Sequence, residues 1–180
     1  MKFAIRSSTV LLATALLLSA CSPKFDWREI RSGDAPYAVS LPSKPTSLTR
    51  QIDLNGTPVA MTMTASVIDG ITFAVGTAEL PDATQAQVSL SAMQTALVNN
   101  ISGTIKQEKV LTMANGSDAG QLAVMEMQAV GPAASNAAPR VLFARFVAKD
   151  KRVYQLVVTG AEPAVKRELV DTFFSSFKLN

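Results

Sequence analysis

The feature that most constrains the fold is a run of strict alternation between two hairpin turns. Residues 58–68 place apolar side chains on one face and mostly small polar side chains on the other. A period of two is typical of a half-buried β-strand. The apolar face consists of Val59, Met61, Met63, Ala65 and Val67. Asn55-Gly56 precedes this run and Asp69-Gly70 follows it, and both dipeptides favour two-residue hairpin turns. Residues 49–80 are therefore predicted to form an antiparallel meander.

The rest of the chain mixes strand patterns with two helical ones. Apolar runs bounded by turn residues predict further strands at residues 37–41, 104–113, 121–130, 140–148 and 152–159. Asp82 and Gln85 resemble a capping box. The helix behind them is predicted to have Ala86, Leu90, Met93, Leu97 and Ile101 on one face and Gln85, Ser89, Gln94 and Asn99 on the other. A second helix is predicted to open at Glu162-Pro163 and to repeat apolar residues at Val165, Leu169, Phe173 and Phe177.

These patterns predict a single α+β domain over residues 37–180. Its mostly antiparallel sheet of six to eight strands is expected to pack with the two amphipathic helices. Residues 131–139 (GPAASNAAP) consist of small residues and are predicted to form a flexible loop.

The N-terminus has the pattern of a secretory signal peptide over residues 1–20. Lys2 and Arg6 form a basic start, and the apolar run that follows at residues 10–18 is too short for a permanent membrane span. Without Lys2 and Arg6, the 17 basic residues fall to 15, against 14 acidic ones. The remaining charge does not favour nucleic acid as a partner.

Leu18-Ser19-Ala20-Cys21 resembles the lipobox of bacterial lipoproteins. The resemblance implies cleavage before Cys21, a diacylated thiol and an acylated amino group. Two or more acyl chains anchor a protein stably to a membrane. Ser22 stands where Asp would retain an enteric lipoprotein in the inner membrane. We therefore expect a lipid anchor in the outer membrane with the domain facing the periplasm. The inner membrane and the cell surface are the alternatives.

Residues 21–36 are expected to be a lipidated tether that is partly packed onto the domain. The signal, the Leu-Pro-Ser-Lys-Pro element at residues 41–45, the meander and the helix together resemble small uncharacterised proteobacterial lipoproteins. The layout of residues 37–179 is also similar to PsbP/Mog1-like sandwiches. That similarity implies a binding or assembly module, and it assigns no functional residue.

The composition narrows the chemistry that the domain could perform. The chain has no His and a single Cys, so a Ser-His-Asp triad, a Cys-His pair and a Cys-based zinc site are excluded. Most acidic residues are expected in turns or at helix starts, and no pair has a spacing that suggests acid–base catalysis. The chain also lacks a glycine-rich phosphate loop. We expect no enzymatic activity, no cofactor and no metal.

Three groups of residues are candidates for function. Glu126 and Arg145 are charges within apolar strands; they could face outward or pair across the sheet, or anchor a ligand in a cavity. Met61, Met63, Met125 and Met127 could fill the core, line a lipophilic or partner-binding groove, or bind Cu(I). Trp27, the only Trp, could pin the tether to the sheet or contact lipid headgroups or a partner.

Two functions therefore remain open. The first is a non-enzymatic, membrane-anchored lipoprotein whose periplasmic domain acts as a binding or assembly module for another envelope component. It predicts an exposed patch near Trp27 or residues 131–139. The alternative is a carrier or sensor of a small lipophilic ligand, which predicts an enclosed cavity lined by Met and Phe.

Overall fold

The computed structural model describes residues 24–133 and 137–180. The expected signal peptide and the lipidation site Cys21 lie outside these residues, as does the middle of the 131–139 loop. The described residues form ten strands and two helices. The sequence-based prediction of an α+β fold with a mostly antiparallel sheet is confirmed.

The strands form one large and one small sheet. The large sheet has seven strands in the order β3-β4-β5-β9-β8-β7-β6, with every neighbouring pair antiparallel. Its strands are β3 (Thr46–Leu54), β4 (Thr57–Ile68), β5 (Ile71–Glu79), β6 (Thr104–Ala114), β7 (Gln121–Val130), β8 (Arg140–Lys149) and β9 (Arg152–Ala161). The small sheet has the order β1-β2-β10 and consists of β1 (Arg28–Arg31), β2 (Tyr37–Leu41) and β10 (Lys178–Leu179).

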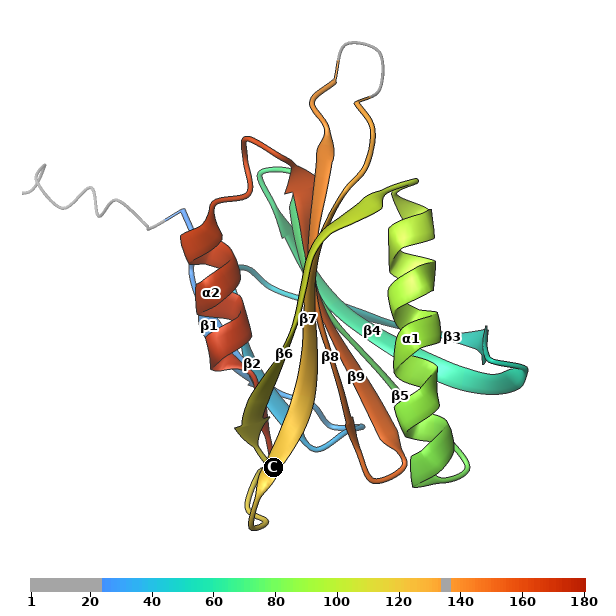
Figure 1. Cartoon of the computed structure of the whole chain (residues 1–180). Helices are drawn as coiled ribbons and strands as arrows, with labels where there is room; N and C mark the ends of the chain where they lie inside the picture. Colours follow the sequence, from blue (N-terminus) through green and yellow to red (C-terminus); the bar gives the residue numbers. More distant parts are fainter. Residues whose placement is uncertain (1–23, 134–136) are drawn as a thin grey trace, which may run out of the picture.

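The two helices cover opposite faces of the large sheet, so the molecule has three layers (Figure 1). α1 (Ala83–Asn100) packs on one face, while α2 (Arg167–Ser176) and the small sheet pack on the other. Two separate apolar cores result. The α1-face core includes Leu90, Met93 and Phe146, and the α2-face core includes Phe73 and Phe173. Strands β5, β8 and β9 are apolar on both faces because each face meets one of these cores.

The predicted hairpin turns are confirmed by backbone geometry. Asn55 and Gly56 have φ values of 55° and 80°, and Asp69 and Gly70 have values of 51° and 72°. Positive φ at both central residues is the mark of a type I′ turn, which Asn, Asp and Gly adopt at low cost. Asp150, between β8 and β9, also has a positive φ of 51°.

The predicted cap of α1 is confirmed, but the predicted exposure of one residue on its polar face is wrong. The Asp82 carboxylate accepts hydrogen bonds from the Gln85 backbone N–H and from the Gln85 side-chain amide, both at 2.8 Å. Ser89, predicted to face solvent, is buried. Ser89 is adjacent to Leu90 and three residues from Ala86, so it lies at the border of the buried stripe, where a small side chain fits against the sheet.

The start and end of α2 differ from the prediction. Glu162 and Pro163 lie in a turn in which the Ala164 N–H donates to the Ala161 carbonyl, and the helix begins only at Arg167. Val165 is buried against the α2-face core, and the chain reaches Arg167 only after this anchor. Phe177 follows the helix as its C-cap, with an extended ψ of 129°, and leads directly into β10.

Strands β1 and β10 were not predicted, β3 is longer than predicted, and one predicted apolar face is incomplete. β1 lies within the segment expected to be the tether and pairs with β2, and β3 starts at Thr46 instead of residue 49. Val67 was predicted to lie on the apolar face of its strand, but it is 62% exposed. The end of β4 thus extends beyond the cover that α1 provides, because a long twisted strand leaves the cover of a straight helix.

Candidate functional site

A buried carboxylate at the centre of three cations is the most unusual feature of the α2 face. In the registers of β7 with its two neighbours, Glu126 is directly opposite Lys109 of β6 and Arg145 of β8. Arg167 reaches the same carboxylate from the first turn of α2. The sequence-based interpretation that Glu126 and Arg145 pair across the sheet agrees with this arrangement, whereas the sequence contained no signal for Lys109 or Arg167.

The contacts of this cluster are short and specific. Glu126 Oε2 accepts from Arg145 Nε at 2.6 Å, while its Oε1 lies 3.0 Å from Lys109 Nζ and 3.1 Å from Arg167 Nη2. Arg145 also donates to the Phe174 carbonyl at 3.2 Å and places its guanidinium over the Phe174 ring. The Glu126 side chain is 4% exposed, but those of Lys109 and Arg167 are 53% and 44% exposed. The cluster therefore has a buried anion and a cationic outer surface.

Two opposing effects set the pKa of Glu126. Burial, the largest single effect, raises the pKa because it penalises the charged form. Hydrogen bonds from Arg145 and Lys109, the charge of Arg145 and a hydrogen bond from Arg167 favour the charged form, and together they outweigh burial. The pKa of Glu126 is consequently lowered, and the carboxylate is ionised at neutral pH.

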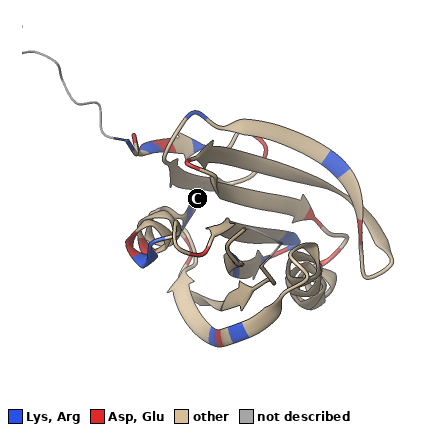
Figure 2. Ribbon diagram, turned by 90° about the horizontal axis from the view of Figure 1, so that it is seen from above, with Lys and Arg blue, Asp and Glu red and all other residues tan. Residues whose placement is uncertain are grey.

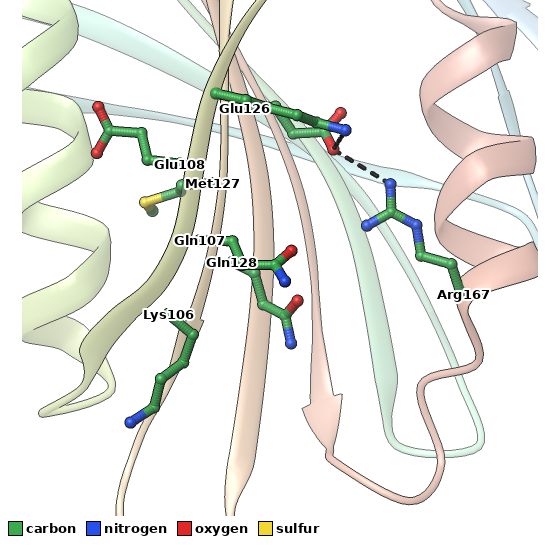
Figure 3. A pocket seen from close by; sticks show the side chains of 8 residues that line it. Lys106, Gln107, Glu108, Glu126, Met127, Gln128 and Arg167 are labelled. Atoms are coloured by element: carbon green, nitrogen blue, oxygen red, sulfur yellow. Dashed lines mark hydrogen bonds and ion pairs between the residues drawn. The ribbon is translucent and has the colours of Figure 1, made fainter.

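A polar pocket of about 400 Å³ lies against this cluster (Figure 3). Its wall includes Lys106, Gln107, Lys109, Glu126, Gln128 and Arg167, so it joins β6 and β7 to the start of α2. A β-bulge interrupts the β6–β7 register between Ile105 and Gln107, and Lys106 is the extra residue. Figure 2 shows charges of both signs on α2 and none on α1, so the two helices that cover the sheet differ in charge.

An apolar pocket of about 180 Å³ lies beside the same cluster, between the sheet and the second half of α2. β6 contributes Leu111 and Met113 to it, α2 contributes Phe174, and Phe177 lines it just after the helix. Arg145 lines this pocket and also binds Glu126, so the ion cluster separates the apolar pocket from the polar one. The two pockets follow one another along β6, and we refer to the pair as the β6–α2 groove.

β6 itself is an edge of the large sheet, because it pairs only with β7. Its first half has the features that protect an edge strand from pairing, namely a bulge and the exposed lysines Lys106 and Lys109. Its second half, residues 110–114 (VLTMA), carries no charge. Val110 there is 72% exposed, the highest value among the large apolar side chains of the described chain.

The other candidate residues serve the cores. Trp27 packs edge-on against Phe73, with ring centroids 5.6 Å apart, and is stacked with Phe25. It is half-buried, which fits the interpretation that it pins the segment before β1 to the sheet. All four candidate methionines belong to the α1-face core or pack against it: Met61, Met63, Met125 and Met127. Met63 Sδ lies 3.4 Å from the amide nitrogen of the buried Gln155, and Met127 also lines the polar pocket.

Three further observations bear on function. In residues 24–133 and 137–180, no group of three acidic or cysteine side chains is placed to hold a metal ion. None of the helices in that same part of the chain is long and apolar enough to cross a membrane. Searches of models of protein families and of characterised proteins found no match. The α+β architecture and the geometry of the β6–α2 groove are therefore what a functional proposal rests on.

Proposed function

We propose that this protein is a lipid-anchored, non-enzymatic envelope protein whose domain binds an extended segment of a partner protein along residues 110–114 of β6. The observation that carries the proposal is the juxtaposition of an uncharged, exposed sheet edge with the apolar pocket lined by Leu111, Met113 and Phe177. An edge strand offers unpaired N–H and C=O groups to an added strand. In binding by strand addition, these groups supply affinity while neighbouring pockets select side chains.

The anchor would keep this domain near the membrane. Lys24, the first described residue, follows the expected acylation site Cys21 by three residues, which can span at most about 11 Å. Lys24 forms an ion pair with Asp69 in the turn between β4 and β5, and β1 begins four residues after Lys24. We therefore propose that the lipid holds the domain close to the periplasmic surface of the outer membrane, on a shorter tether than residues 21–36 would provide.

Site-specific photo-crosslinking in intact cells tests the strand-addition proposal. A photoreactive residue replaces Val110, Thr112 or Ala114 in turn, and the crosslinked partner peptides are sequenced by mass spectrometry. These three side chains share one face of β6. An added strand places residues two apart opposite them, so the crosslinks should fall on one partner segment at successive steps of two residues.

The matched control is the same probe at Val67, another exposed valine, which lies near the end of β4, pairs with β5 and is outside β6. This position should give no crosslink to the segment. Crosslinks from residues 110, 112 and 114 that scatter over unrelated sequences, or that appear equally from residue 67, would contradict the proposal.

A second candidate is the carrier of a small lipophilic ligand. The apolar pocket favours it, because Met113, Phe174 and Phe177 form a Met- and Phe-lined wall between sheet and helix. Its volume of about 180 Å³ is below the roughly 300 Å³ at which ligand pockets usually begin. Native mass spectrometry of the gently purified protein tests this function: a co-purifying molecule of defined mass that is lost in Met113→Glu would support it, and a bare monomer would count against it.

A further inference from the structure

We infer that the polar pocket binds a carboxylate, and that the partner segment presents this carboxylate four residues away from the apolar side chain that enters the apolar pocket. The inference rests on the proposed strand addition at β6 and specifies which segments the groove would accept. It is drawn from the charge of the Glu126 cluster and from the spacing of the two pockets.

The ion cluster around Glu126 has one more positive charge than negative charge. Lys109, Arg145 and Arg167 supply three positive charges, whereas Glu126 and Asp171 supply two negative ones. Lys106 and Glu108, which also line the pocket, cancel each other in net charge. Glu108 lies toward α1, where it accepts a hydrogen bond from Gln94 at 2.8 Å, and Figure 3 shows its side chain directed away from Arg167. A single negative charge would balance the pocket.

The donors that remain are placed for a carboxylate. Arg167 uses Nε for Asp171 and Nη2 for Glu126, and a guanidinium has five N–H donors, so further donors are left over. Lys109 has three donors and directs one of them to Glu126. Gln107 and Gln128, paired across β6 and β7, add side-chain amides to the wall (Figure 3). Carboxylates bind such donors through charge-assisted hydrogen bonds, which are roughly twice as strong as neutral ones.

The spacing follows from the strand. Lys109 lines the polar pocket and Met113 lines the apolar one. They share the α2 face of β6 and are four residues apart, which is about 13 Å along a strand. A strand added beside β6 advances at the same rate, so its side chains reach the two pockets from positions i and i+4. The occupant we infer is therefore an extended segment with an acidic residue and a large apolar residue in this spacing.

Selection from a displayed library of random eleven-residue peptides tests this inference. The purified full-length protein in detergent micelles serves as the target. Val110→Lys serves as the counter-target, because a lysine on an edge strand disfavours pairing with an added strand. The selected peptide is then synthesised with its acidic residue and with the matching amide, Asp→Asn or Glu→Gln. Both peptides are titrated against the wild type, Lys109→Gln and Lys44→Gln. Lys44 is an exposed lysine outside the groove and provides the matched charge control.

The selected peptides should be enriched in an acidic residue four positions from an apolar one. The amide peptide should bind both the wild type and Lys44→Gln about tenfold more weakly than the acidic peptide does. With Lys109→Gln the two peptides should differ much less. If Val110-dependent peptides are selected but carry no acidic preference, or if Lys109→Gln leaves the difference intact, the carboxylate inference is overturned and strand addition stands. If no selected peptide depends on Val110, both proposals fail together.

Discussion

Replacing Glu126 with Gln should destabilise the domain far more than the same change at a surface glutamate. Glu126→Gln keeps the shape of the side chain but removes the negative charge that holds Lys109, Arg145 and Arg167. Breaking a buried ion pair by removing one partner costs about 3–5 kcal/mol. We expect the lower end of this range, about 3 kcal/mol, because Lys109 and Arg167 are half-exposed and can be solvated by water once released.

Urea unfolding measures this loss directly. Trp27 fluorescence reports on the packing against Phe73, and circular dichroism reports on the sheet, so coincident transitions would support two-state behaviour. With a urea dependence of about 2 kcal/mol per molar for a domain of this size, a loss of 3 kcal/mol lowers the midpoint by about 1.5 M.

The matched control is Glu79→Gln. Glu79 also pairs with an arginine of the neighbouring strand, Arg152, but the Glu79 side chain is 60% exposed. Exposed pairs contribute about 0–1 kcal/mol, so the midpoint should move by less than about 0.5 M. Equal midpoints for Glu126→Gln and Glu79→Gln would refute the reasoning that burial of the Glu126 carboxylate makes its partners essential.

Three further outcomes can be measured on the same protein. Because the pKa of Glu126 is lowered in the folded state, its charge stabilises the fold at pH values above the ordinary pKa of 4.5, and this contribution is lost as the pH falls through the lowered pKa. The urea midpoints of the wild type and Glu126→Gln should therefore converge in acid. A difference between the two midpoints that stays constant with pH would contradict the pKa shift. Asp82→Ala removes the cap of α1 and should cost about 1 kcal/mol, against a few tenths for Gln85→Ala, as read from thermal unfolding. Phe173→Ala should cost about 3–5 kcal/mol because Phe173 is fully buried and packs edge-on against Phe73 at 5.6 Å; a cost below 1 kcal/mol would show that this core does not close around α2.

Local sequence signals were sufficient for the elements whose geometry is set by neighbouring residues. The Asn55-Gly56 and Asp69-Gly70 turns need positive φ, and the dipeptides themselves supply it. The cap of α1 depends on Asp82 and Gln85, which are three residues apart. In both cases the partners are close along the chain, so a pattern of a few residues predicts the structure.

Local sequence patterns did not predict the features that depend on a distant element. Pro163 is compatible with a helix start, but the burial of Val165 delays α2 until Arg167. β10 consists of two residues and exists only because β2 offers it a pairing edge. Lys109 and Arg167 belong to the same cluster although 58 positions separate them, as their numbers show, and only the fold brings both to Glu126.

The sequence by itself determined the order of the elements from β2 to α2, the Asn-Gly and Asp-Gly turns and most of each apolar face, because each depends on residues adjacent or a few positions apart. The expectation of a lipid anchor at Cys21 rests on a local motif in the same way. The tertiary structure alone decided that β6 is one of the two edge strands of the large sheet and that the β6–α2 groove adjoins it. Strand order depends on pairings between distant segments. Local sequence patterns do not show how the free energies of alternative pairings differ. The site we propose lies at such a meeting of distant segments.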